Sequence, residues 1–247
     1  GNLFFYNAMK SDIGIFEPEF RDKIVNDMFK ESEGFYTLAI QSDQNDPISQ
    51  KNMGKLLLRK DEADRAIEFI ESSLELEESL ESKKLLVKAL IKSGNLEEAE
   101  TKLEELDEDD DYWLLKGDIA KARGGWGRSI QFYEESSGDK AYIKKGDLFL
   151  KNERYEPALE AYSEYLKRDE NNHKALKAKA RCLFELNRKE EALNHMKKSI
   201  SIDPQDDEKW FMLGDMMEDK EETDEARKAF QNAIEINPEN KDAEKRL

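Results

Sequence analysis

The side chains best suited to metal binding or nucleophilic chemistry are few in this sequence. It has two histidines, His173 and His195, and one cysteine, Cys182. The histidines have no third ligand and lack the His-Glu-x-x-His spacing of zinc proteases. The cysteine lies among alanine, leucine and phenylalanine, a setting typical of a small core residue. No nucleophile, base and orienting group come together, so we expect no enzyme activity, no metal site and no cofactor.

Two other segments have compositions that occur in ligand-binding loops. The acidic run 107–111 lacks the alternating oxygen ligands, central glycine and distal glutamate of a calcium loop. We interpret it as a linker that caps the helix carrying Trp113. The glycine-rich segment 124–127 follows no predicted strand and precedes no Gly-Lys-Ser/Thr sequence, so it does not match a phosphate loop. We expect it to be a turn between two helices.

A repeated element must position these residues. Three positions recur at intervals of 34 residues, as Gly146, Ala158 and Tyr162, then Ala180, Ala192 and Met196, then Gly214, Ala226 and Phe230. Pairs of small residues twelve apart extend the pattern, at Gly54/Ala66, Val87/Ala99, Gly117/Ser129, Gly146/Ala158, Ala180/Ala192 and Gly214/Ala226. Val87 and Ser129 are the imperfect members. Small residues let two helices cross closely, so the period predicts a stacked array of helical hairpins.

The last unit carries the fullest set of marks, namely Trp210, Leu213, Gly214, Ala226, Phe230 and Pro238. These residues resemble the tetratricopeptide repeat family, whose pattern is Trp, Leu-Gly, Ala, an aromatic residue and Pro. The resemblance implies an all-α, right-handed α-solenoid of about six helical hairpins with an N-terminal helical cap. It also implies a protein–protein interaction module or adaptor that binds a peptide segment in its concave groove.

We expect the six units at residues 47–79, 80–109, 110–138, 139–172, 173–206 and 207–240. The second and third units are shorter, so we expect their second helices to lose about one turn. Residues 1–46 form an N-terminal helical segment that is a cap, a degenerate first hairpin or the tail of a preceding domain. Residues 241–247 read as the start of a truncated C-terminal helix.

In this family the first helix of each hairpin lines the groove, which implies a set of groove residues. The cations are Lys51, Lys55, Lys84, Lys88, Lys140, Lys144, Lys174, Lys177 and Arg181, and the apolar positions singled out are Leu114, Ile143 and Phe211. Cations along the inner face of a chain with net charge -17 indicate an acidic peptide ligand. The alternative is that the lysines form solvated helix faces and pair with nearby carboxylates.

One subclass of the family clamps the C-terminal carboxylate of chaperone tails with Lys, Asn and Arg side chains. The corresponding places in the third to fifth units hold Leu114, Asp118, Lys144, Lys174 and Ala178. Only one lysine matches cleanly, so we do not expect this clamp.

Composition limits the remaining classes of function. The negative net charge argues against nucleic acid, and no apolar run approaches the roughly 20 residues that cross a bilayer. One cysteine and no secretory signal favour a cytoplasmic location. Because the chain begins without methionine and its last helix is short, we also consider a regulatory or targeting repeat region of a larger enzyme. Self-association through the ends of the array is a further expectation.

Overall fold

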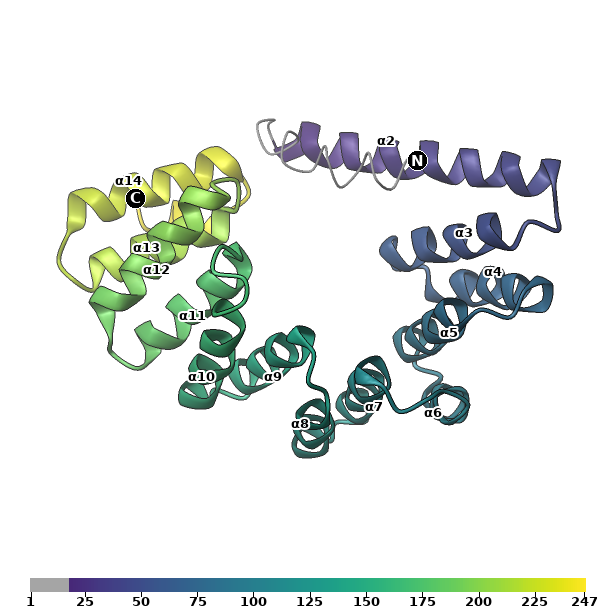
Figure 1. Ribbon diagram of the computed structural model, residues 1–247. Helices are drawn as coiled ribbons and strands as arrows, with labels where there is room; N and C mark the ends of the chain where they lie inside the picture. The colour runs from purple at the N-terminus through teal and green to yellow at the C-terminus, as the bar shows by residue number, and fades with distance from the viewer. Residues whose placement is uncertain (1–17) are drawn as a thin grey trace. The chain divides into compact units, whose positions relative to one another are not determined.

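The structure is a computed structural model that describes residues 18–247, with side chains from residue 25 onward (Figure 1). It divides into two compact units, Glu19–Ser137 and Gly138–Leu247. All regular secondary structure in the described part of the chain is helical. Among these helices, none combines the length and the apolar composition needed to span a membrane.

The first unit contains one long helix and three helical hairpins. Helix α2 spans Pro18–Ser42, and the hairpins are α3 Pro47–Arg59 with α4 Ala63–Leu76, α5 Leu80–Ser93 with α6 Leu96–Glu104, and α7 Asp110–Ala122 with α8 Trp126–Glu135. Each helix from α3 to α7 packs on the one that follows it. The short α6 and α8, with 9 and 10 residues, confirm the missing turn expected in the second helices of these hairpins.

Helix α2 corrects one interpretation of the N-terminal segment. It continues through Gly34 without reversing, so no degenerate hairpin is formed within residues 18–46. Interpretations that concern residues 1–17 lie outside the described residues. Phe29, Tyr36 and Ile40 of α2 pack against the core of the first unit. Glu33 adds an ion pair to Lys60, with 2.6 Å between Oε2 and Nζ. These contacts fit a cap, which remains our proposal for this segment.

The second unit contains three hairpins and a short final helix. The pairs are α9 Asp139–Lys151 with α10 Tyr155–Leu166, α11 His173–Glu185 with α12 Lys189–Ile202, and α13 Asp207–Glu218 with α14 Thr223–Ile236. Helix α15 follows at Lys241–Glu244. Consecutive helices from α9 to α15 pack on one another, so the unit is a stack of hairpins.

The paired small residues lie at the helix crossings, as the sequence pattern predicts. A Cβ atom added to Gly117 would come within 2.3 Å of the Tyr133 ring, and one added to Gly146 within 2.7 Å of the Tyr162 ring. The imperfect member Ser129 has a local explanation, because its buried hydroxyl donates to the Gly117 carbonyl over 2.8 Å. The glycines therefore allow aromatic side chains of the second helix to lie directly on the first helix.

The turn inside each hairpin uses a residue with left-handed backbone geometry. Gly94 and Gly124 take this place in two hairpins, with φ angles of 87° and 79°. Non-glycine residues take it in the others, namely Asp61, Glu153, Asn187 and Glu221. The left-handed residue lets the chain leave the first helix and reverse.

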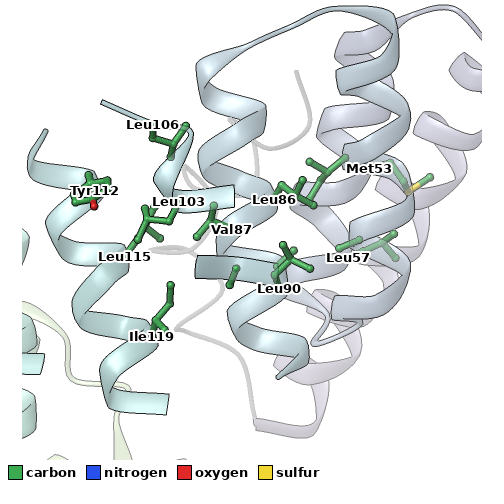
Figure 2. Packing of buried hydrophobic residues seen from close by; sticks show 14 of the residues in the cluster. Met53, Leu57, Leu86, Val87, Leu90, Leu103, Leu106, Tyr112, Leu115 and Ile119 are labelled. Atoms are coloured by element: carbon green, nitrogen blue, oxygen red, sulfur yellow. The ribbon is translucent and has the colours of Figure 1, made fainter. Parts of the chain in front are cut away.

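The core of the first unit is a continuous set of aliphatic side chains between successive hairpins. Figure 2 shows Leu57, Val87, Leu90, Leu103 and Leu115 converging from neighbouring helices. Val87, the larger member of its crossing pair, is fully buried in this core. Each hairpin thus depends on its neighbour for burial of its apolar face.

Candidate functional site

Most of the lysines predicted to line a groove in the first unit are bound to carboxylates of the next hairpin. Lys51 Nζ lies 2.7 Å from Glu81 Oε2, and Lys55 contacts the same carboxylate. Lys84 Nζ lies 2.5 Å from the Asp109 carboxylate and also reaches Asp111. Hydrogen bonds from the two lysines lower the pKa of Glu81 to about 2. These lysines therefore link adjacent first helices.

The second unit repeats this arrangement once and leaves other cations exposed. Lys177 Nζ lies 2.7 Å from Glu208 Oε2 and 3.0 Å from Asp206 Oδ2. Lys174 and Arg181 on the same helix are exposed. Of the remaining predicted cations, Lys88 and Lys140 are exposed and Lys144 is half-buried.

The predicted apolar positions differ in accessibility. Leu114 is only 5% exposed and belongs to the interior of the first unit. Ile143 and Phe211 are partly buried against core clusters of the second unit. Phe211 also contacts the Phe230 ring, with 5.7 Å between the ring centroids. Phe211 also lines a cavity of this unit.

That cavity lies on the first-helix side of the second unit, between α11, α13 and the region of α15, and holds about 450 Å³. Its apolar lining is Phe184, Phe211, Met212 and Met216. Its polar lining is Arg181, Glu185, Asp207, Glu208, Asp215, Asn240 and Asp242. The cavity thus joins an apolar surface to five carboxylates and one guanidinium.

The groove residues predicted from sequence include members of this site, among them Arg181 and Phe211, but sequence reasoning did not bring the site together as a whole. Other members follow helical spacing from these two, since Phe184 and Glu185 lie three and four residues beyond Arg181. Asp215 likewise lies four residues beyond Phe211. Residues so spaced share one helix face, which is the signal that could have identified them.

Among the cavity residues, Asp215 has a carboxyl group with a shifted pKa. Its pKa is raised by burial and by the neighbouring carboxylates Glu218 and Asp242, while the positive charge of Arg246 opposes the rise. Arg246 Nη2 lies 2.9 Å from Asp215 Oδ1, and Arg246 Nη1 lies 2.6 Å from Glu218 Oε2. A positive group such as Arg246 thus favours the charged form of this buried carboxyl group.

A second hollow of about 640 Å³ occurs in the first unit, between α6, α7 and α8. Trp126 lies on its wall and is 42% exposed. Lys116 occupies its aromatic part, with Nζ 5.0 Å from the Tyr112 ring centroid and 5.3 Å from that of Phe132. In the sequence, this region is marked by the shortened second and third units and by the glycine-rich segment 124–127. Because an internal cation already lies against the rings, this hollow is the weaker candidate.

His173 and the cysteine take structural positions. Lys209 is fully buried and donates to His173 Nδ1 over 3.0 Å and to Asp203 Oδ2 over 2.9 Å. Cys182 is buried, and burial raises the pKa of its thiol to about 11. Within residues 18–247, no three side chains of the metal-binding types come together.

Known proteins resemble this chain in sequence over part of its length. The Hsp70-Hsp90 organizing protein 3 of Arabidopsis thaliana is 29% identical over 99 residues, which cover 40% of this chain and 18% of the relative. The Hsp70-Hsp90 organizing protein 2 of the same plant is 28% identical over 112 residues, covering 45% and 19%. The match thus spans about a fifth of the length of these relatives.

Solved structures resemble the chain over most of its length. YrrB, described as a tetratricopeptide repeat protein with an unusual peptide-binding site, has a TM-score of 0.52 at 20% identity and covers 86% of this chain and 98% of its own. A tetratricopeptide repeat protein from Parabacteroides merdae has a TM-score of 0.58 at 12% identity, covering 92% and 93%. The Cut9–Hcn1 complex of the APC/C has a TM-score of 0.67 at 10% identity, covering 89% and 45%.

Sequence profiles of the tetratricopeptide repeat match residues 143–207 and 207–240. Repeat boundaries expected before residue 143 stay predictions. The profile matches agree with the hairpins of the second unit, with their crossing glycines and with the α-solenoid fold of the solved structures. Residues 143–240 of this chain therefore consist of tetratricopeptide repeats.

Proposed function

We propose that this protein is an interaction module that binds a peptide segment of a partner protein on the first-helix side of its second unit. The tetratricopeptide repeats support a protein–protein interaction role. The cavity lined by Phe184, Phe211, Met212 and Met216 is the observation that carries the peptide-binding proposal.

The size and lining of the cavity suit side-chain anchors. A volume of about 450 Å³ lies within the range of roughly 300–1,000 Å³ found for ligand pockets in proteins. Apolar anchors that fill such a pocket usually contribute more affinity than charges at its edge. Phe184 and Met212 are only partly buried, so a ligand side chain would remove more of their apolar surface from water.

An acidic ligand, the first expectation from the groove lysines, receives less support from the contacts. Lys51, Lys55, Lys84 and Lys177 already contact carboxylates of the next hairpin. An acidic peptide would have to compete with these internal partners. Its preference for the groove stays a prediction, as do a cytoplasmic location and self-association through the ends of the array.

The two Arabidopsis relatives carry the names of Hsp70 and Hsp90, but each match covers less than a fifth of the relative. We take from them a protein partner and no specific one. Because the repeats match a segment of longer proteins, a regulatory or targeting repeat region of a larger protein is a second candidate. We propose no catalytic role.

A peptide selection tests the proposal. Dodecamers selected from a random phage-displayed library on the whole chain would be measured by fluorescence anisotropy against the wild type and a Phe184→Ala/Met212→Ala variant. We expect the variant to lose about tenfold or more in affinity, as for residues at binding hot spots.

Trp126→Ala serves as the matched control, since it removes an exposed aromatic side chain of the other hollow. Circular dichroism verifies that both variants are folded. Peptides that bind the wild type and the double variant equally would show that this cavity is not the binding site.

A further inference from the structure

A carboxylate follows the crossing glycine in three hairpins, and in each an aromatic ring of the second helix lies against that glycine. The triplets are Gly117, Asp118 and Tyr133, then Gly146, Asp147 and Tyr162, then Gly214, Asp215 and Phe230. In the first triplet the tyrosine hydroxyl donates to Asp118 Oδ1 over 2.6 Å, and in the second the hydroxyl donates to Asp147 Oδ1 over 2.7 Å. The hydroxyl thus supplies these carboxylates with an internal donor.

The third triplet keeps the ring and lacks the donor. The Phe230 ring lies against Gly214 as the tyrosine rings lie against their glycines, because an added Cβ would be 2.4 Å from its edge. Phenylalanine has no hydroxyl, so Asp215 receives no hydrogen bond from this ring. This carboxylate lines the cavity, which places an acceptor without its usual donor beside the apolar lining.

We propose that Asp215 receives the cationic side chain, Lys or Arg, of a partner peptide whose neighbouring apolar residue fills the cavity. This inference rests on the proposed function and specifies the ligand of the same site. It predicts a ligand with a positive charge next to an apolar anchor, the opposite charge from that indicated by the groove lysines.

The charges around the cavity support a cationic ligand. Its lining holds five carboxylates and one cation, Arg181. Some of this negative charge is already balanced, since Glu208 pairs with Lys177 and Asp242 with Lys245. Three lining carboxylates remain outside these two pairs, against the one guanidinium of Arg181.

Arg246 provides an internal example of the proposed contact. Its guanidinium contacts Asp215 and Glu218 together, as a ligand guanidinium would. Its side chain remains 47% exposed, so the contact is open to competition. Removing this internal cation by Arg246→Gln should therefore increase the affinity for a cationic peptide.

A peptide array tests the charge preference directly. The probes are synthetic dodecamers with two phenylalanines three residues apart, in which each other position in turn carries Lys, Gln or Glu. For the wild type we expect the best Lys peptides to bind about tenfold more tightly than the matched Glu peptides, from charge contacts of up to about 1 kcal/mol each. Asp215→Asn should reduce this ratio to about two.

Two further variants separate the missing donor from the charge itself. Phe230→Tyr gives Asp215 the hydroxyl that the other two triplets have and keeps the carboxylate, so we expect the Lys preference to fall about threefold with no loss of melting temperature. Glu225→Gln removes an exposed carboxylate of α14 outside the cavity and should leave the preference unchanged.

The outcomes distinguish this inference from the proposed function. The inference would be overturned if Lys and Glu peptides bind the wild type equally. It would also be overturned if the Lys preference of the Asp215→Asn variant is as large as that of the wild type. If those peptides still lose affinity in the Phe184→Ala/Met212→Ala variant, the peptide-binding proposal stands alone. Both proposals fail if no peptide binds, or if peptides bind the Phe184→Ala/Met212→Ala variant as tightly as the wild type.

Discussion

Replacing Gly117 by alanine tests how the helix crossing of the third hairpin is built. The new Cβ would lie 2.3 Å from Tyr133 Cε1 and 2.4 Å from Cδ1. The ring cannot move freely, because Tyr133 is 1% exposed and its hydroxyl is bound to Asp118. Overpacking costs about 2 kcal/mol, and a weakened hydrogen bond to a carboxylate costs about 1 kcal/mol more.

Alanine recovers about 1 kcal/mol through its higher helix propensity. The net loss is therefore about 2 kcal/mol, equivalent to a decrease of roughly 4–8 °C in melting temperature for a chain of this size. Circular dichroism measures the global transition. Because repeat arrays depart from two-state unfolding, hydrogen exchange of the α7 and α8 amides measures the local change.

Gly127→Ala is the matched control in the same hairpin. An added Cβ there meets no atom within 4 Å, and the position lies inside α8. We expect this variant to be unchanged or stabilised by up to about 1 kcal/mol. If Gly117→Ala melts at or above the temperature of Gly127→Ala, the crossing does not depend on the absence of a side chain.

Three other predictions concern pH and backbone geometry. The pKa of Glu81 is lowered to about 2, so its contribution to folding stability is complete above about pH 4.5 and is lost as the pH falls toward 2. In acid titrations, the Glu81→Gln variant should therefore lose less folding stability than the wild type. Burial and the charge of Lys209 lower the pKa of His173, and burial lowers the pKa of His195. As the pH falls, these histidines are therefore protonated in the unfolded chain before they are protonated in the folded chain, so folding stability decreases below about pH 6.5. A His173→Asn/His195→Asn variant should reduce that slope in urea titrations. Glu153 has a φ of 56°, so Glu153→Gly should stabilise the second unit by about 1 kcal/mol in thermal unfolding.

The repeating part of the fold could be predicted from sequence because its signals are local. Gly146 and Tyr162 lie sixteen residues apart and meet at one crossing, so a short window contains both sides of the contact. The shortened α6 and α8 were visible as shortened units. The course of the chain before residue 47 was harder to predict, since Gly34 reads as a turn signal although α2 passes through it. The neighbouring packing of Tyr36 and Ile40 favours the continuous helix.

The site could be predicted only in part, because its charges are determined by contacts between hairpins. Lys177 and Glu208 lie 31 residues apart in sequence, and helical spacing within one helix gives no sign of their contact. The cavity also needs residues of the α15 region, such as Asn240, beside α11 and α13. A lysine counted on a predicted groove face is therefore not evidence of a free positive charge.

The same contacts explain why net charge is a poor guide to the ligand. Carboxylates near the start of a first helix, such as Asp109 and Glu208, stabilise the N-terminus of that helix. They also bind a lysine of the preceding first helix. Lysines and carboxylates used in this way stabilise the stack and largely cancel in the groove. The charge presented to a ligand then depends on groups whose internal partner is missing or shared. Asp215 is such a group, because Phe230 removes the donor that Tyr162 supplies to Asp147, and this single ring substitution favours a cation in the cavity.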